Sequence, residues 1–224
     1  MLIAPLILMG CSNNLSVRLQ DNLSEVRFNL FTASNEKINV NFTSGFREDP
    51  YVINGISENK KEFGVITVKF LCDISTKEGT PKFVITINEM DFDNEFILNP
   101  FDQTYVQDIS TFVLDDSTIF IKITWQDFYF ESELVNESNN FNINHKQALN
   151  IFIKEFETDI TNLLKGDINF EMYVKIISDP SLNIDQNYFY VSLISVNGNS
   201  FSVIIDPNSG QILAKNQSLN NKFF

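Results

Sequence analysis

The stretch NYFYVSLISVNGNSFSVIID, residues 187–206, decides the fold of the C-terminal part of the chain. Apolar and polar side chains alternate on both sides of Asn197-Gly198, and this period of two residues predicts strands that each bury one face. Asn-Gly between two such runs is a strong short-range signal of a β-hairpin. We therefore predict two antiparallel strands joined by a tight turn at Asn197-Gly198.

The sequence on either side of this hairpin extends the predicted sheet. DPNSGQIL follows it, and there Pro207 can preset a turn while Gly210 can take the positive φ that the turn exit requires. Upstream, INFEMYVKIIS (residues 168–178) alternates in the same way. Together these runs predict four strands.

A helix is predicted directly before these strands, in HKQALNIFIKEFETDITNLLKGD (residues 145–167). Asn144 is a plausible N-cap and Gly166 a plausible C-terminal stop. An apolar stripe at helical spacing predicts that the helix lies on the sheet. The stripe consists of Leu149, Phe152, Ile153, Phe156, Ile160, Leu163 and Leu164.

The stretch from about His145 to Leu213 resembles a PepSY module. The resemblance rests on the early helix with Ala148, the hairpin, and the closing pattern Asp206-x-x-x-Gly210 followed by Ile212-Leu213. It implies a small helix-on-sheet domain outside the cytoplasm, of a kind found in protease propeptides and envelope proteins. It implies no catalytic residues. We accordingly predict a PepSY-like α+β domain over residues 145–224.

The N-terminal half, residues 24–136, has the period of strands throughout. SEVRFNLFTA, KINVNFTSGF, FGVITVKFL and KFVITINEM alternate and are rich in β-branched and aromatic residues. Clusters of Asn, Asp, Gly, Ser and Pro separate them. We predict an antiparallel β-sandwich, immunoglobulin-like or similar, of about seven strands, joined by a polar linker (137–144) to the α+β domain. The fold class is therefore mostly β.

The chain opens MLIAPLILMGCSNN, and this start predicts a location. The apolar run is too short to span a bilayer, which takes about 20 residues, but it fits the core of a secretory signal. Leu8-Met9-Gly10-Cys11 resembles a bacterial lipobox. The resemblance implies that Cys11 receives a lipid, that residues 1–11 form the signal ending at this Cys, and that residues 12–23 are a tether. No Lys or Arg precedes the run, so either the gene start lies upstream of Met1 or Cys11 belongs to a buried N-terminal strand.

Charge and composition exclude some classes of partner. The formal net charge is -13 and the isoelectric point is near 4.4. Nucleic-acid binding needs a basic face, which this chain lacks the positive charge to build. The same shortage disfavours electrostatic docking to anionic lipid.

Catalytic and metal-binding patterns are weak. His145 is the single His, which argues against a Ser-His-Asp triad or a His-based zinc site. Cys72 is interpreted as a small buried residue of a strand. Asp91, Asp93 and Glu95 resemble the start of a calcium loop, but the required Gly and bidentate Glu are missing, so a solvated turn is favoured. We expect no catalytic residue, no cofactor and no metal.

Two surfaces remain candidates for binding. The stretch 43–64 is long for a connection and carries Arg47, Asp49, Tyr51 and Lys60-Lys61; it is either a functional loop or a cover for a sheet edge. The aromatic run of Trp125 and residues 128–130 is expected to be the core and edge of one strand. If it were exposed, it would indicate a carbohydrate or partner surface.

The sequence thus predicts a non-catalytic, extracytoplasmic lipoprotein, held at the membrane by Cys11, that binds an envelope or secreted protein. The PepSY resemblance implies a role in regulating a protease. The alternative is a module that binds carbohydrate or envelope polymer through the sandwich. A third hypothesis is a hydrolase that uses two carboxylates. It would require two acidic side chains that face each other in a cleft, about 5–9 Å apart.

Overall fold

The computed structural model describes residues 12–49, 59–111, 116–165, 169–178 and 187–219. Cys11 and the lipobox-like residues before it lie outside this range, as does Gly166. Strands take up 54% of the structure and helices 17%, so the prediction of a mostly β fold is confirmed. Within the described residues the strands form two sheets.

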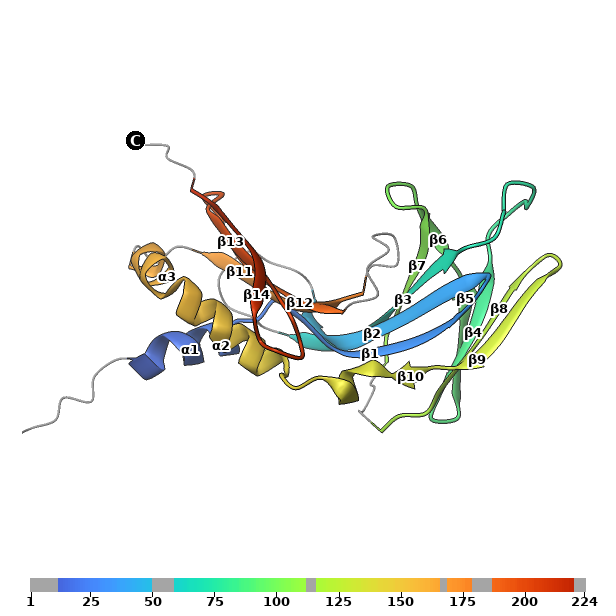
Figure 1. Cartoon of the computed structure of the whole chain (residues 1–224), viewed down its shortest axis with the longest axis horizontal. Coiled ribbons are helices and arrows are strands. Elements are labelled where there is room, and N and C mark those ends of the chain that lie inside the picture. Colours follow the sequence, from blue (N-terminus) through green and yellow to red (C-terminus); the bar gives the residue numbers. More distant parts are fainter. Residues whose placement is uncertain (1–11, 50–58, 112–115, 166–168, 179–186, 220–224) are drawn as a thin grey trace, which may run out of the picture.

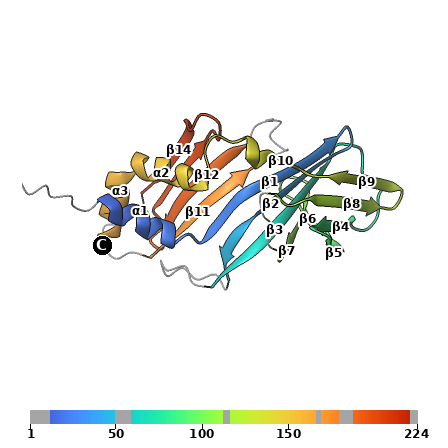
Figure 2. The same cartoon turned by 90° about the horizontal axis from the view of Figure 1, so that it is seen from below.

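The larger sheet runs along the length of the molecule (Figures 1 and 2). Its strand order is β14 (Ile212–Ser218), β13 (Ser200–Ile205), β12 (Tyr188–Ser195), β11 (Phe170–Ile177), β1 (Glu25–Asn35), β2 (Ile38–Glu48), β3 (Lys60–Phe70), β7 (Thr104–Ile109) and β6 (Ile97–Asn99). The short β10 (Val135–Asn136) also pairs with β1. The smaller sheet has the order β5 (Met90–Glu95), β4 (Lys82–Ile87), β8 (Ile119–Trp125) and β9 (Phe128–Glu133).

One parallel pairing joins the two halves of the chain. Strand β1 pairs in parallel with β11, and Val26 lies opposite Val174. The predicted sheet of residues 168–213 and the strands of the N-terminal half are therefore parts of one sheet. Helices α2 (His145–Glu155) and α3 (Glu157–Leu164) lie between β10 and β11 in the chain. After these helices the chain comes back to the large sheet, where β11 pairs with β1.

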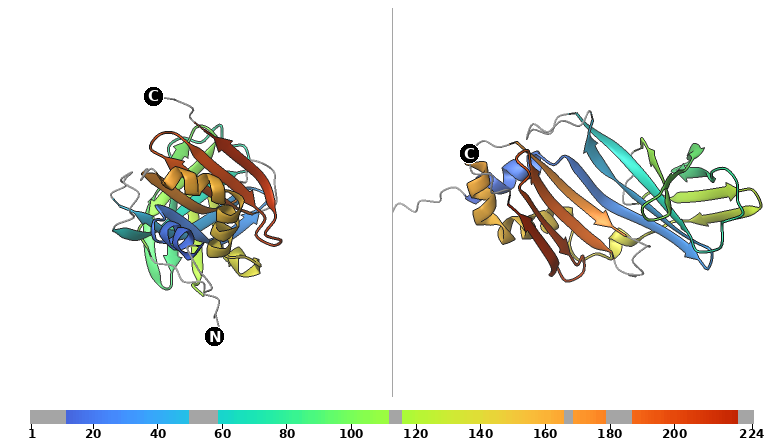
Figure 3. Two further views of the ribbon diagram at one scale, coloured as in Figure 1. Left: turned by 90° about the vertical axis from the view of Figure 1, so that its left-hand side faces the viewer. Right: turned by 90° about the horizontal axis from the view of Figure 1, so that it is seen from above.

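The helices close a first hydrophobic core, which we call the helix-side core. Helices α1 (Ser12–Asp21) and α2 lie against the strands at one end of the large sheet (Figure 3). The alternation predicted from the sequence puts one face of each strand in this core. Its fully buried side chains include Val26, Ala148, Phe152, Ile160, Met172, Val174, Val191, Leu193 and Ile205.

The smaller sheet closes a second core, the two-sheet core. Side chains from both sheets meet in it, and it holds the single tryptophan, Trp125. Its fully buried members include Ile38, Val40, Phe42, Ile66, Val68, Ile85, Ile87, Ile119 and Ile123. Strand β1 contributes Val26 to the helix-side core and Phe31 to the two-sheet core. Strand β2 contributes Phe42 to the two-sheet core, and its partly buried Phe46 packs against the helix-side core.

The prediction of a tether over residues 12–23 is wrong for the described part of it. Ser12–Asp21 form α1, and Leu19 and Leu23 are buried in the helix-side core. The cause is visible in the sequence, because Leu15 and Leu19 lie four residues apart and so share one face of a helix. Leu23 follows just beyond the end of that helix.

Of the predicted helix over 145–167, residues 145–165 are described, and there the helix is present but broken. Helix α2 ends and α3 begins at Phe156, whose φ of -115° and ψ of 22° are not helical. The stripe predicted from its spacing is buried on both pieces, for example Phe152 on α2 and Ile160 on α3.

Both predicted turns of the C-terminal part are confirmed. The β12–β13 turn is closed by the Ser195 N–H donating to the Asn199 carbonyl (2.8 Å), and Gly198 has a φ of +81°. In the next turn the Asp206 carboxylate accepts from the Asn208 and Ser209 N–H groups at 2.7 and 2.9 Å. Gly210 exits that turn with a φ of +71°, a conformation that glycine adopts without strain.

Candidate binding pocket

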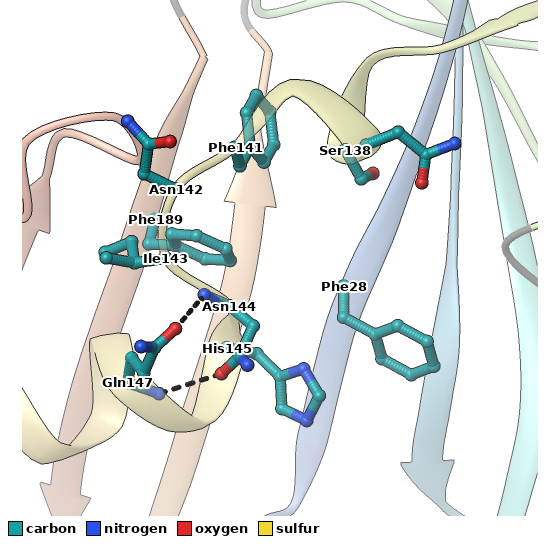
Figure 4. Close-up of a pocket in the computed structure, with 10 residues that line it drawn as sticks. Phe28, Ser138, Phe141, Asn142, Ile143, Asn144, His145, Gln147 and Phe189 are labelled. Carbon is teal, nitrogen blue, oxygen red and sulfur yellow. Dashed lines mark hydrogen bonds between the residues drawn. The ribbon is translucent and has the colours of Figure 1, made fainter.

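A pocket with a volume of about 350 Å³ opens where the chain passes from the two-sheet core to helix α2 (Figure 4). Phe28 of β1 and Phe189 of β12 contribute from the large sheet. All other described lining residues come from one stretch of the chain. They are Ser138, Asn139, Phe141, Asn142, Ile143, Asn144, His145 and Gln147.

This stretch was predicted as a polar linker, and the structure ties it to both sides. Residues Glu137–Asn140 form the 3₁₀ helix η1. The Leu30 N–H of β1 donates to the Ser138 Oγ at 2.5 Å. The Asn142 and Ile143 N–H groups both donate to the Pro207 carbonyl, at 3.1 and 3.0 Å. The wall of the pocket is therefore held by hydrogen bonds to β1 and to the Asp206 turn.

The start of α2 forms the floor of the pocket and is capped as predicted. The Asn144 Oδ1 accepts from the Lys146 and Gln147 N–H groups, both at 3.0 Å, and the Gln147 Oε1 accepts from the Asn144 N–H at 2.8 Å. This reciprocal pair is a capping box. It fixes the helix start, so His145 and Gln147 are presented to the pocket in set positions.

Aromatic rings give the pocket its apolar surface. The Phe28 and His145 rings lie 5.0 Å apart between centroids, tilted by 33°. Phe141 meets Phe189 edge to face, with 6.2 Å between centroids. His145, the single His of the sequence, lies in the first turn of α2, where it is half-buried and lines the pocket.

The polar side chains in the described lining of the pocket are four amides, the Ser138 hydroxyl and the His145 imidazole. Among the described residues that line it, none is Asp, Glu, Lys or Arg. Ring faces beside amide and hydroxyl groups suit an uncharged ligand that has an apolar body and a few hydrogen-bonding atoms.

Both described ends of the stretch 43–64 belong to strands. Strand β2 runs to Glu48 and β3 starts at Lys60, and the residues between 50 and 58 lie outside the described range. Arg47 is paired with Asp108 at 2.6 Å, and Lys61 with Asp49 at 2.6 Å. Arg47 and Lys61 are therefore held in ion pairs, while the Lys60 Nζ donates to the Asp21 carbonyl at 3.2 Å.

The acidic trio and the free cysteine also take other places than expected. Asp91, Asp93 and Glu95 are exposed on strand β5, not in a turn. The Lys82 Nζ lies 3.2 Å from the Glu95 carboxylate. Cys72 is a half-buried free thiol just beyond the end of β3, not in the strand. In the described part of the chain, no group of three or more His, Cys, Asp and Glu side chains is placed to hold a metal ion.

The aromatic run at residues 125–130 forms a hairpin instead of one strand. Trp125 ends β8, Phe128 begins β9, and these two residues pair across the turn. Trp125 and Phe130 are buried, whereas Tyr129 is 59% exposed. Gln126 at this turn has a φ of +55°, which alternation alone does not reveal.

An ionic network lies on the face of β1 and β11 that is opposite the helix-side core. The Glu25 carboxylate accepts from the Arg27 Nε at 2.6 Å and lies 3.1 Å from the Lys175 Nζ. Burial alone would raise the pKa of Glu25, but Arg27 and Lys175 outweigh it and hold that pKa below its ordinary value. Burial lowers the pKa of Lys175. This network fixes the junction of β1 with β11.

An exposed apolar tip is a second feature that the sequence reasoning missed. At the β6–β7 turn, Phe101 is 97% exposed, and Ile97 on β6 is 68% exposed. The signal was present in NPFDQT, residues 99–104, where a large aromatic residue stands inside a run of turn formers. We call residues Asn99–Gln103 the Phe101 tip.

Comparison with protein-family models, with curated protein sequences and with solved structures found no match. In the described residues, no helix has both the length and the apolar character needed to span a bilayer. The function is therefore argued from the pocket and its surroundings.

Proposed function

We propose that this chain is a non-catalytic binding protein of the cell envelope, held at the membrane by a lipid on Cys11, which grips an uncharged, ring-bearing segment of a protein partner. The observation that carries the proposal is the pocket between β1, η1 and α2. Its rings, amides and hydroxyl match such a segment, and its wall is fixed by hydrogen bonds before any ligand arrives. A preformed site loses little conformational freedom on binding.

The finer fold that we propose is a sandwich followed by a PepSY-like domain. The two-sheet core, filled from both sheets, supports the sandwich. The packing of α2 against β11, β12 and β13, together with the turn from Asp206 to Gly210, supports the PepSY resemblance. If the resemblance extends to role, the partner is a secreted protease whose activity the helix-on-sheet part restrains.

The lipid proposal has a structural consequence. Helix α1 begins at Ser12, directly after Cys11, and Leu19 packs in the helix-side core. A lipid on Cys11 would therefore hold the folded body close to the membrane surface. One acyl group gives marginal membrane binding, and stable attachment takes two signals; the two acyl chains of a diacylglyceryl group meet that need.

The lipid proposal is tested by feeding a labelled fatty acid to cells that express the full gene. We expect label in the wild type and in Cys72→Ser, and none in Cys11→Ser. Cys72→Ser is the matched control, because it removes the only other cysteine. Equal labelling of Cys11→Ser and the wild type would refute the anchor.

The pocket proposal is tested by photo-crosslinking in the native cell. A photoreactive phenylalanine analogue replaces Asn139, an exposed lining residue, in one strain and Lys122, on the outer face of the smaller sheet, in another. We expect one defined protein adduct from position 139 and none from position 122. The same adducts from both positions, or none from either, would contradict a specific pocket.

A further inference from the structure

The Phe101 tip is the most exposed large apolar feature in the described structure, and its backbone is tightly held. Phe101 is 97% exposed. The Gln103 N–H donates to the Asn99 carbonyl at 3.0 Å and the Phe101 N–H donates to the Asn99 Oδ1 at 3.2 Å. The Thr104 N–H and Oγ1 both donate to the Asp102 carboxylate, at 3.0 and 2.7 Å. A rigid turn that presents one bare ring has the character of an anchor residue, because little freedom is lost when it binds.

The pocket beside α2 fits this tip in size and in chemistry. Its volume of about 350 Å³ admits an aromatic side chain, and its walls carry rings that can pack edge to face with the incoming ring. The exposed Asn139 amide at its rim can form hydrogen bonds with the backbone of a turn.

Charge does not oppose contact between two copies of this chain at these two places. The chain has 29 acidic and 16 basic residues, so most faces of two copies repel each other. The described pocket lining has no Asp, Glu, Lys or Arg. The tip has one charge, Asp102, whose carboxylate already accepts two hydrogen bonds from Thr104. Contact between tip and pocket therefore brings few like charges together.

The tip cannot reach the pocket of its own chain. Figure 1 shows the β6–β7 hairpin at the top of the molecule, near the smaller sheet, while η1 and the start of α2 lie at the lower edge toward the other end. The contact must therefore join two molecules, and it uses a different surface on each.

We propose that the Phe101 tip of one molecule inserts into the pocket beside α2 of a second molecule, so that the protein associates head to tail. The proposal identifies the partner of the pocket as a second copy of the chain, and it rests on the proposed binding function of that pocket. Such a contact is heterologous, so each molecule can bind one neighbour through its tip and another through its pocket. The small contact predicts weak association that appears only at high concentration.

Sedimentation velocity of the full chain, in a Cys11→Ser background that carries no lipid, tests the proposal. We expect the average mass of the Cys11→Ser protein to rise with concentration, and Phe101→Ser to weaken the association at least about tenfold. Tyr129→Ser is the matched control, since it removes another exposed aromatic residue, and it should associate as the Cys11→Ser protein does. Circular dichroism checks that each variant is folded.

Mixing two defective variants gives the sharpest result. Phe101→Ser keeps a usable pocket, and Asn139→Trp fills the pocket but keeps a usable tip. An equimolar mixture should form one-to-one pairs and nothing larger, while each variant alone stays monomeric. A monomeric Cys11→Ser protein at the highest concentration, or a mixture that stays monomeric while that protein associates, overturns the proposal.

Two further outcomes separate this inference from its alternatives. If the Cys11→Ser protein stays monomeric while position 139 crosslinks to a different protein in the cell, the second-copy inference fails and the proposed binding function stands. If Phe101→Ser abolishes co-sedimentation with phosphatidylcholine vesicles but leaves self-association unchanged, the tip is a membrane contact and the proposal is overturned.

Discussion

The two hydrophobic cores of this protein share strands β1 and β2 but are closed in different ways. Helices cover the strands of the helix-side core, whereas a second sheet covers the strands of the two-sheet core. The pocket lies at the boundary, lined by Phe28 of β1, which precedes the switch of that strand from one core to the other. Where the covering layer changes from helices to a second sheet, a gap is left on the large sheet, and the connecting segment, residues 137–144, borders this gap.

The largest expected effects come from emptying each core in turn. Phe152→Ala in the helix-side core should lower the free energy of unfolding by about 3–5 kcal/mol, and Ile121→Ala in the two-sheet core by about 2–5 kcal/mol, because both side chains are almost fully buried. Urea unfolding followed by circular dichroism measures both. Phe120→Ala, on the same strand as Ile121 but half-exposed, is the control. A change below about 1 kcal/mol for Phe152→Ala would break the account of the helix-side core.

The next effect concerns helix α1, which belongs to the helix-side core alone. Leu19→Ala should lower the free energy of unfolding by about 2–4 kcal/mol, because Leu19 is fully buried. Val17→Ala, on the exposed side of the same helix, should change it little. Equal effects of the two substitutions in urea unfolding would return residues 12–21 to the role of a tether.

A smaller effect is expected where β11 joins β1. The pKa of Glu25 lies below its ordinary value of 4.5 in the folded protein, so its ion pairs stabilise the fold above that pH and are lost as the pH falls through the folded-state pKa. Glu25→Gln should therefore lower the free energy of unfolding by about 1.5–3 kcal/mol at pH 7. The difference from the wild type should shrink in unfolding experiments below pH 4.5. A difference that is the same at every pH would show that charge is not the cause.

The smallest effect concerns the floor of the pocket. Asn144→Ala removes the capping box of α2 and should lower the free energy of unfolding by about 1 kcal/mol. The exposed Asn140, at the end of η1, provides the control substitution Asn140→Ala. If thermal unfolding shows no difference between the two variants, the cap does not set the start of α2.

The elements predicted from the sequence are those with a local signature. The alternation in residues 188–205, the Asn197-Gly198 turn and the Asn144 cap each depend on residues close together in the chain, and all three are found. The shared sheet could not be predicted, because the pairing of Val26 with Val174 joins distant strands that alternate like any others. The pocket was missed for the same reason. Its wall depends on the Pro207 carbonyl meeting Asn142 and Ile143, a contact that neither segment reveals alone.

The central claim is that the shared sheet makes the two cores one unit, with the pocket held between them. Trp125 is the single tryptophan and lies in the two-sheet core, so its fluorescence reports unfolding of that core, while the ellipticity of the helices reports the helix-side core. The measurement is urea unfolding of Phe152→Ala followed by both signals. The account predicts that the tryptophan midpoint falls together with the ellipticity midpoint, although Phe152 lies in the other core. A tryptophan midpoint that stays at the wild-type value would contradict the claim and show two domains that unfold independently.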